Sequence, residues 1–215
     1  MGSWKNKIKK LSFYLPNGAV RKVKYLKKKG IRIGEDLRLY DAPSIVIDES
    51  RPWLLQIGNH VRLTHGVIIL THDFSKSVLL TRYAENIGEG ATTTIGNNCF
   101  IGNNSIILMG AKIGNNVIVG AGSVVHGLIP DNVVVAGNPA RVICSLDEYY
   151  EKRKRKSPYE AINVATEYHK AYGRMPSEYE MRHFKSSFSG RNGEYKSWEN
   201  FEEFISEVNS KVEGE

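Results

Sequence analysis

Large aliphatic residues recur at every sixth position through the middle of the chain, a spacing that neither an α-helix nor a half-buried strand produces. These positions are Ile95, Ile101, Ile107, Ile113, Val119 and Val125. A second set of mostly small residues follows each of them by four positions: Cys99, Ser105, Ala111, Val117, Ser123 and Ile129. Self-similarity at so short a period predicts a solenoid, in which each repeat is one unit stacked on the next.

The period predicts a triangular coil, because a chain with one inward aliphatic residue every six positions must turn a corner in each repeat. Three repeats then complete one coil, with the aliphatic residue inside and the small residue in the crowded corner. We expect pairs such as Gly96-Asn97 and Gly114-Asn115 to allow the backbone dihedrals of these corners. Strands of successive coils would pair at a spacing of about 4.8 Å.

The same register continues towards the N-terminus with two interruptions. It passes through Ile33, Leu39, Ile45, Ile57, Leu63 and Ile69. Arg51 stands where an aliphatic residue is expected, and we interpret its segment, DESRPW, as a kinked corner. Between Ile69 and Ile95 the register is lost, which predicts a loop over about residues 73–93 that leaves the solenoid. Loops held by a rigid scaffold are where binding and catalysis usually lie.

After residue 143 the repeats stop and helix signals begin, which predicts a helical extension over residues 144–215. The segments SLDE, SPYE and SEYE, starting at Ser145, Ser157 and Ser177, each place a serine three residues before an acid, the pattern of a helix capping box. Apolar residues then follow at helical spacing: Ala161, Val164, Ala165 and Tyr168, and later Phe201, Phe204, Ile205 and Val208.

Charge is concentrated at the N-terminus. Residues 1–30 contain ten Lys or Arg and no acid, whereas the whole chain carries a net charge of +7. Trp4, Ile8, Leu11 and Leu15 fall at helical spacing among these lysines, which predicts a basic amphipathic helical segment. Two interpretations stay open: the segment buries these four residues as a cap on the first coil, or it contacts an anionic membrane surface. No nucleic-acid recognition motif accompanies it.

Amino-acid composition further narrows the class of protein. The 215 residues are 41% hydrophobic and 25% charged, and no apolar run approaches the eighteen residues of a membrane span. The lysine-rich start lacks the apolar core of a signal peptide. Two cysteines provide no disulfide framework, and Cys99 lies at a small inward position where a packed thiol is expected. We therefore expect a cytoplasmic protein.

The repeat segment resembles a known family. IGNNCFIGNNSIILMGAKIGNNVIVGAGSVV, followed by IPDNVVVAGNPARVI, is similar to the left-handed parallel β-helix of hexapeptide-repeat acyltransferases, over about residues 31–143. THGVIILTHD and AGNPARVI resemble the galactoside, maltose and polysaccharide O-acetyltransferase branch most closely. Parallel crossovers are usually right-handed, so the left-handed winding is implied by the resemblance alone. The resemblance also implies a homotrimer with sites between subunits.

The resemblance identifies His72, in the T-H-D element before the loop, as a general base. Transfer from a thioester to a hydroxyl requires removal of a proton, and imidazole accepts one near neutral pH. His65, in THGV, is a candidate to orient the acceptor or to hold structure. Asp48, Asp73 and Arg82 are further candidates for acceptor contact or support, whereas His60 is interpreted as an ordinary corner residue.

The resemblance further implies acetyl-CoA as the acyl donor and no metal. It assigns donor contacts to Asn103, Gly120, Ala121, Pro139, Ala140 and Arg141. Turn geometry alone also explains the glycines and Asn103. In the family, a T-K-D-I-P element often follows the last repeats, whereas this chain has His126, Gly127, Leu128, Ile129 and Pro130. The usual lysine is absent, so phosphate neutralisation must come from elsewhere, with Arg141 or the N-terminal segment as candidates.

The function expected from this reasoning is acetyl transfer to a sugar hydroxyl of a surface polysaccharide or its precursor. An N-acyltransferase acting on a nucleotide-linked amino sugar stays open, because the same base serves an amine. A metal hydratase resembling γ-class carbonic anhydrases, or a non-catalytic scaffold, is the alternative of another class. The spacing of His60, His65 and His72 does not match the histidine pattern of such hydratases.

Overall fold

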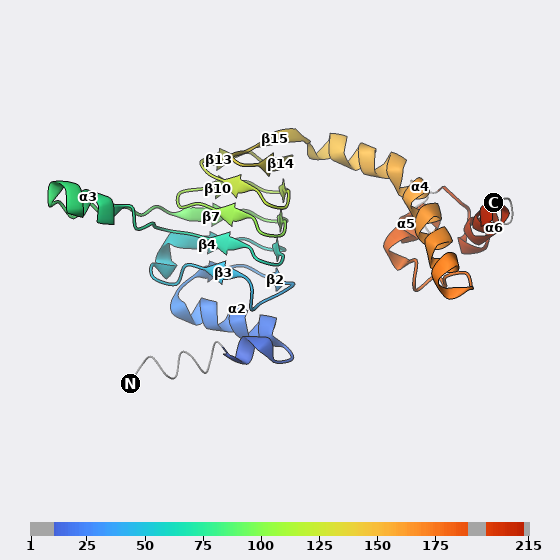
Figure 1. Ribbon diagram of the computed structural model, residues 1–215, viewed down its shortest axis with the longest axis horizontal. Coiled ribbons are helices and arrows are strands. Elements are labelled where there is room, and N and C mark those ends of the chain that lie inside the picture. Colours follow the sequence, from blue (N-terminus) through green and yellow to red (C-terminus); the bar gives the residue numbers. More distant parts are fainter. Residues whose placement is uncertain (1–10, 189–196, 213–215) are drawn as a thin grey trace. The chain divides into compact units, whose positions relative to one another are not determined.

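The computed structural model describes residues 11–188 and 197–212 in two compact units. The first unit comprises Met1–Asp147 and the second Glu148–Glu215. Short parallel strands build the first unit, and helices build the second (Figure 1).

The strands of the first unit form three sheets. They are β1 Arg32–Ile33, β2 Arg38–Leu39, β3 Val46–Ile47, β4 Leu55–Ile57, β5 Arg62–Leu63, β6 Ile68–Ile69, β7 Thr93–Ile95, β8 Phe100–Ile101, β9 Ile106–Ile107, β10 Lys112–Ile113, β11 Ile118–Val119, β12 Val124–Val125, β13 Leu128–Ile129, β14 Val133–Gly137 and β15 Ala140–Ser145. Sheet A has the order β1-β4-β7-β10-β13, sheet B the order β15-β14-β11-β8-β5-β2, and sheet C the order β12-β9-β6-β3. All neighbours are parallel except β14 and β15, which form an antiparallel hairpin.

Each coil contributes one strand to each sheet, which is the arrangement expected of a chain that turns a corner every six residues. Ile95 of β7 pairs with Ile113 of β10, and Ile101 of β8 pairs with Val119 of β11. We call the resulting three-sided stack the prism. One aliphatic side chain of each strand points into it, and the small residues of the repeat, such as Cys99 and Ser105, are buried at the corners. Burial raises the pKa of the Cys99 thiol, so Cys99 is a packing residue.

Two positions of the expected register were wrong. Ile47, and not Ile45, pairs with Ile69, because the first coil holds two extra residues before β3. Ile129 pairs with Ile113 and therefore occupies an aliphatic strand position, not a small corner position. The repeat that ends at Ile129 is shortened at Gly127, whose φ of +65° allows a tight turn.

We expected each Gly-Asn pair to adopt the unusual backbone dihedrals of the corners, and the structure differs. The left-handed conformation falls on the second asparagine, with φ of 54° at Asn98 and 55° at Asn116. Gly96 is required for close approach instead, because a Cβ there would lie 2.4 Å from the carbonyl oxygen of Gly114. Asn98 Nδ2 donates to Asn116 Oδ1 at 2.8 Å, so stacked asparagines also link successive coils.

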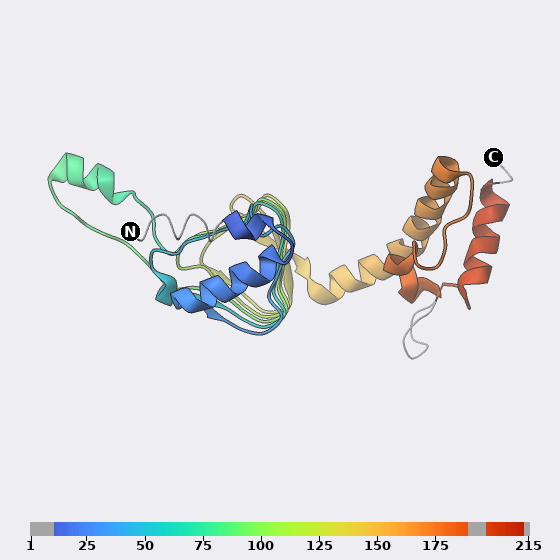
Figure 2. The same cartoon turned by 90° about the horizontal axis from the view of Figure 1, so that it is seen from below.

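Helices η1 (Ser12–Tyr14) and α2 (Gly18–Lys29) lie at the open end of the first coil (Figures 1 and 2). Trp4 and Ile8 of the expected amphipathic helix lie outside the described residues. The interpretation of the segment as a cap required Leu11 and Leu15 to be buried, but both side chains are exposed. The cap is formed by α2, which buries Leu26 against the core of the prism.

A buried lysine completes this cap. Lys22 Nζ donates to the carbonyl oxygen of Ala42 at 2.6 Å and to that of Ile45. The carbonyl edge of the first coil has no preceding coil to pair with, so Lys22 satisfies acceptors that would otherwise be buried without a donor.

The loop between β6 and β7 leaves the prism at one corner and carries the helix α3 (Lys76–Tyr83), which the sequence analysis did not predict (Figure 2). No residue of α3 is buried. Two contacts close the base of the loop: Ala91 N donates to Thr71 O at 3.2 Å, and Arg51 Nη1 donates to Glu89 O at 2.7 Å. Arg51 interrupts the repeat because it holds this loop, and the short helix η2 (Pro52–Leu54) forms the corner beside it.

The second unit contains α4 (Leu146–Tyr172) from Glu148 onward, η3 (Arg182–Phe184), α5 (Lys185–Phe188) and α6 (Phe201–Val212). Its core is Ala161, Ala165, Met181, Phe188, Trp198, Phe204 and Val208. The helix start expected at Ser157 was wrong, because α4 continues through Pro158 and buries Ala161 and Ala165 beyond it. At Ser177 the capping contacts do form, with Ser177 N and Oγ donating to Glu180 Oε2, but the turn leads into η3.

Candidate active site

His72 and Asp48 form a close pair at the root of the loop. Asp48 follows β3 and His72 lies three residues beyond β6, and these strands are parallel neighbours in sheet C, so the two corners stack. His72 Nδ1 lies 2.6 Å from Asp48 Oδ2. The side chain of His72 is 15% exposed and that of Asp48 only 7% exposed. A buried carboxylate therefore orients a histidine that still reaches the surface.

Asp48 is held by donors that the sequence analysis missed. Ser50 donates to Asp48 Oδ1 through its N–H at 2.9 Å and its hydroxyl at 2.7 Å. Thr71 donates to Asp48 Oδ2 through its N–H at 3.1 Å and also through its hydroxyl. Burial alone raises the pKa of the Asp48 carboxyl, but the hydrogen bonds from Thr71 and Ser50 outweigh burial and hold the pKa well below its usual range.

This arrangement places the proton of the neutral His72 imidazole on Nδ1. Because Asp48 is ionised, it accepts the hydrogen bond of His72 Nδ1–H, which leaves Nε2 as the basic nitrogen. Ser50 Oγ lies 3.2 Å from the same Nδ1. Phe74 packs edge-on against the His72 ring with 5.0 Å between ring centroids and limits its rotation.

The same vertical stacking creates two further histidine–aspartate pairs between the first and second coils. His60 Nδ1 lies 3.1 Å from Asp36 Oδ2, and His65 Nδ1 lies 2.6 Å from Asp41 Oδ2. In both pairs, as in the His72 pair, the partners are 24 residues apart. However, the His60 and His65 side chains are 62% and 60% exposed. Only the His72 pair is largely withdrawn from water.

The three histidines lie at three different corners and each contacts its own carboxylate. Within residues 11–188 and 197–212, no group of three or more His, Cys, Asp or Glu side chains is placed to hold a metal ion. The geometry of the described residues therefore gives no support to a hydratase-type metal site.

Asp73 and Arg82 have other contacts in this structure. Asp73 Oδ1 accepts hydrogen bonds from Ser75 N at 2.9 Å and Ser75 Oγ at 2.7 Å, which shape the start of the loop. Arg82 lies on α3, and its guanidinium stacks over the ring of Tyr83 at 5.5 Å. Neither residue touches His72 among the contacts described.

Asn103, Gly120 and Ala121 come together at the corner between sheets B and C. Gly122 N donates to Asn103 O at 2.8 Å, which stacks the two turns. A Cβ at Gly102 would lie 2.6 Å from Ala121 N, so this corner is narrow and lined mainly by backbone. A surface of this kind lets an extended chain approach closely.

Pro139, Ala140 and Arg141 belong to the β14–β15 hairpin above the same corner. Gly137 N donates to Ser123 Oγ at 3.2 Å and ties the hairpin to the coil below. The Asn138–Pro139 peptide is cis, and Ala140 is buried. Arg141 Nη1 bonds the carbonyl oxygen of Ala140 at 3.0 Å, and the Arg141 residue is exposed.

The candidate base and the candidate donor residues lie at opposite ends of the strands of sheet C. Asn103 precedes β9, whereas His72 follows β6, and these two strands are parallel neighbours. One chain therefore presents the base at one corner of the prism and the donor residues at another.

Comparison with known proteins decides the family. The model for "Bacterial transferase hexapeptide (six repeats)" matches residues 92–127. Protein CapG of Staphylococcus aureus is 46% identical over 134 residues, which cover 62% of this chain and 77% of that protein. The chain belongs to the hexapeptide-repeat transferase family. The recognition made from the sequence, and with it the prediction of a transferase, is confirmed.

Two comparisons with galactoside acetyltransferases also give matches. Galactoside O-acetyltransferase of Escherichia coli (strain K12) is 49% identical over 63 residues, which cover 27% of this chain and 31% of that protein. A solved structure of galactoside acetyltransferase in complex with coenzyme A is 24% identical, with a TM-score of 0.48, and the match covers 69% of this chain and 82% of that chain.

Proposed function

We propose that this protein is an acetyl-CoA-dependent O-acetyltransferase that acts on a sugar hydroxyl of a surface polysaccharide or its precursor. The observation that carries the proposal is the largely buried His72–Asp48 pair, with Nδ1 on the carboxylate and Nε2 available as a base. Family membership and the similarity to a galactoside O-acetyltransferase support the type of reaction and the class of acceptor. A cytoplasmic location and the left-handed winding of the prism belong to the same proposal.

In the proposed reaction, His72 acts as the general base. Its Nε2 removes the proton of the acceptor hydroxyl while that oxygen attacks the carbonyl carbon of the thioester, and Asp48 stabilises the imidazolium that forms. The new carbon–oxygen bond forms, the carbon–sulfur bond breaks, and His72 returns the proton to the departing thiolate. No acyl-enzyme is needed, so the catalytic pair has no nucleophilic role.

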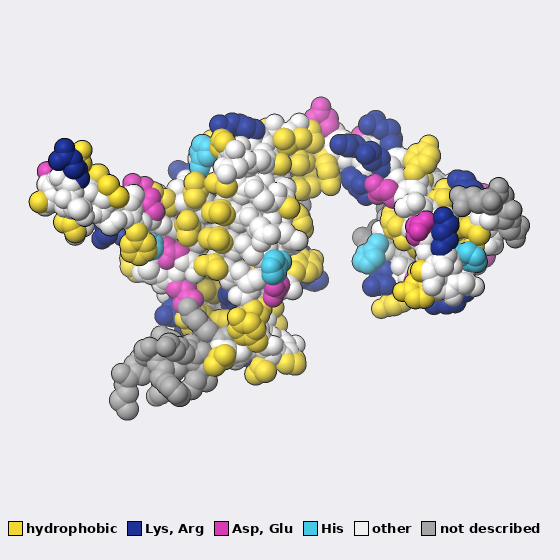
Figure 3. Space-filling view, viewed as in Figure 1, with side chains coloured by type: hydrophobic (Ala, Val, Ile, Leu, Met, Phe, Trp, Pro, Cys, Tyr) yellow, Lys and Arg dark blue, Asp and Glu magenta, His cyan; other side chains and the backbone are white. Residues whose placement is uncertain are grey.

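The proposed active unit is a homotrimer with sites between subunits. The separation of His72 from Asn103 supports this trimer. Head-to-tail packing in a ring can place the corner that carries His72 in one subunit against the corner that carries Asn103 in the next. The outer face of sheet C lies between these edges and carries a stack of β-branched residues: Val46, Ile68, Ile106 and Val124. Figure 3 shows a column of hydrophobic side chains on the prism. A neighbouring subunit would also cover α3.

The direct test is an acetyl-transfer assay with a panel of acceptors. The protein is incubated with acetyl-CoA and with sugars, nucleotide-linked sugars or amino sugars, thiol release is followed, and the product is identified by mass. We expect an O-acetylated sugar. Acetylation of an amino sugar on nitrogen would instead establish the N-acyltransferase alternative.

The matched variants are His72→Asn and His60→Asn. Both remove a histidine that contacts an aspartate, but only His72 is placed as the base. His72→Asn should lower kcat by about 10²-fold or more with little change in the KM for acetyl-CoA, whereas His60→Asn should retain activity. Near-normal turnover by His72→Asn would reject the assignment of the base.

A further inference from the structure

The N-terminal end of the prism exposes a group of large apolar side chains. Leu11, Tyr14, Leu15 and Val20 are 64%, 72%, 60% and 54% exposed. They lie on η1, its flanks and the start of α2, while buried Phe13 packs η1 against Tyr25 of α2 and Leu26 fixes α2 to the core of the first coil. Exposed apolar side chains gathered in one region, rather than scattered singly, mark an interaction surface. Yellow side chains are visible in this region in Figure 3.

The outward side of α2 adds positive charge to this region. Lys24, Lys27 and Lys28 are exposed on it, and residues 1–30 contain no acid. Two nearby carboxylates are engaged: Asp36 Oδ2 lies 2.6 Å from Arg62 Nη2, and Glu49 accepts a hydrogen bond from the Tyr25 hydroxyl at 2.6 Å. A third carboxylate, that of Glu35, is exposed on the first coil opposite α2. We call Leu11, Tyr14, Leu15, Val20 and the three lysines the basal surface.

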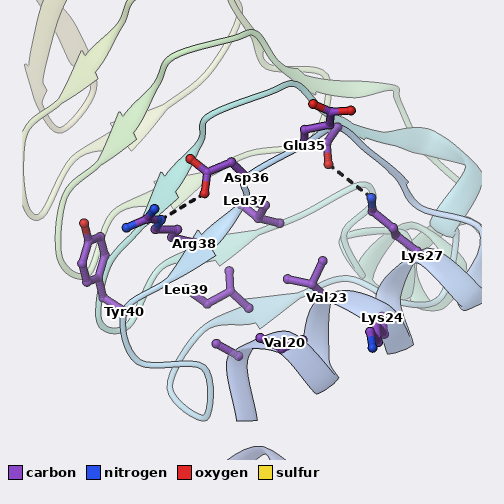
Figure 4. A pocket seen from close by; sticks show the side chains of 12 residues that line it. Val20, Val23, Lys24, Lys27, Glu35, Asp36, Leu37, Arg38, Leu39 and Tyr40 are labelled. Carbon is purple, nitrogen blue, oxygen red and sulfur yellow. Dashed lines mark hydrogen bonds and ion pairs between the residues drawn. The ribbon is translucent and has the colours of Figure 1, made fainter. Parts of the chain in front are cut away.

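A groove lies next to the basal surface, between α2 and the first coil (Figure 4). Its volume is about 660 Å³. Val20 and Val23 of α2 form one wall, Leu37 and Leu39 of the coil form the other, and Lys24 and Lys27 stand at its margin. Lys27 Nζ bonds the carbonyl oxygen of Gly34 at 3.2 Å, which spans the groove at one end. The apolar walls fit an acyl chain, and Lys24 and Lys27 offer ammonium groups to an anionic headgroup, whereas the carboxylates of Glu35 and Asp36 stand on the coil side of the lining.

We propose that the basal surface docks on an anionic lipid bilayer. The lysines contact the headgroups, Tyr14 and Leu15 enter the boundary between headgroups and acyl chains, and the groove accepts an acyl chain. Charge complementarity selects this occupant over a neutral apolar partner. The inference does not rest on the proposed reaction, because it is measured by membrane binding alone.

The test is co-sedimentation with vesicles at low salt, since exposed charges are screened within about 10 Å at 0.1 M ionic strength. Vesicles of phosphatidylglycerol mixed with phosphatidylcholine are compared with vesicles of phosphatidylcholine alone. We expect the full-length protein to sediment with the mixed vesicles only, and increasing salt to release it. Absence of binding to the mixed vesicles at low salt overturns the proposal.

Two pairs of matched variants separate the basal surface from overall charge and hydrophobicity. Lys24→Gln/Lys27→Gln/Lys28→Gln should weaken binding by at least about tenfold, whereas Lys152→Gln/Arg155→Gln/Lys156→Gln, with equal charge loss on α4, should not. Tyr14→Ser/Leu15→Ser should weaken binding although all lysines remain, and Tyr159→Ser/Val164→Ser should not. Thermal unfolding checks that each variant is folded.

Two outcomes contradict the proposal. Equal loss of binding in both triple variants would mean that net charge alone attracts the protein to the vesicles. A lower molar mass of Tyr14→Ser/Leu15→Ser in solution, together with unchanged vesicle binding, would identify the basal surface as a contact between copies of the chain.

Discussion

At the scale of single residues, burial distinguishes one histidine–aspartate pair from two others with the same sequence spacing. Asp36 and Asp41 hold exposed histidines, whereas Asp48 is surrounded by Thr71 and Ser50 and keeps its charge away from water. An ionised carboxylate in such a position orients the imidazole and stabilises its protonated form. We therefore propose that Asp48 acts as a positioning residue for His72.

Replacing Asp48 by Asn tests this role, because the side chain keeps its shape and loses its charge. We expect Asp48→Asn to lower kcat by about 10–10²-fold with an unchanged KM for acetyl-CoA. The double variant Asp48→Asn/His72→Asn should have a kcat little lower than that of His72→Asn alone, since both changes disrupt the same histidine–aspartate pair. Additive losses, measured by thiol release, would show that Asp48 acts separately from His72.

The same variant has an effect on stability that depends on pH. The pKa of Asp48 in the fold lies well below its usual range. Its stabilising contribution is thus fully present above the unfolded value of about 3.9 and is lost as pH falls through the lower folded value. The difference in unfolding free energy between wild type and Asp48→Asn, measured with urea, should be largest near neutral pH and shrink in acid. A difference that grows in acid would contradict the assigned charge state.

The sequence could propose His72 as the base because the T-H-D element precedes the loss of the repeat, and this role stays a prediction. Thr71 and Ser50 could not be assigned to Asp48, since their contacts depend on which corners stack. The sequence does not reveal which corners of the first coil stack, because β3 is displaced by two residues from the period of six and Arg51 departs from the repeat to hold the base of the loop.

At the scale of elements, the period of six correctly predicted where most strands of the prism lie. The period gave the wrong position at Ile45, where two extra residues precede the strand, and at Ile129, where a shortened turn precedes it. In both places an aliphatic residue still falls at the expected spacing, so the error is not visible in the sequence. Within the described part of the predicted segment 1–30, the cap is formed by α2 and not by the residues around Leu11 and Leu15. Leu11 and Leu15 have helical spacing, but Leu26 and the buried amine of Lys22 are what match the open end of the first coil.

The cap predicts a specific role for Lys22. Lys22→Met should lower the unfolding free energy by about 1–3 kcal/mol, because the carbonyl groups of Ala42 and Ile45 lose a buried donor. Lys24→Met, two positions along the same helix and exposed, should change it by less than about 0.5 kcal/mol. Denaturant unfolding of both variants is the measurement, and equal stability would mean that the cap depends on apolar packing alone.

At the scale of the whole molecule, the proposed active unit depends on contacts between copies of the chain. The stack of β-branched residues on sheet C and the helix α3 are at least partly exposed in the single chain, and the proposed ring of three would cover them. We expect a solution mass near three times the 24.2 kDa of one chain. Ile106→Lys, on the outer face of sheet C, should produce an inactive monomer. Thr94→Lys, on the outer face of sheet A, should remain a trimer, and light scattering distinguishes these results.

The most direct test of the central claim is complementation between two inactive variants. His72→Asn removes the base, and Ala121→Trp obstructs the donor corner. If each site combines His72 of one subunit with the donor corner of the next, random mixing of equal amounts leaves about a quarter of the sites intact, so activity should return to about a quarter of the wild-type value. Mixed trimers without acetyl transfer, from subunits that are each folded, would contradict a site shared between subunits.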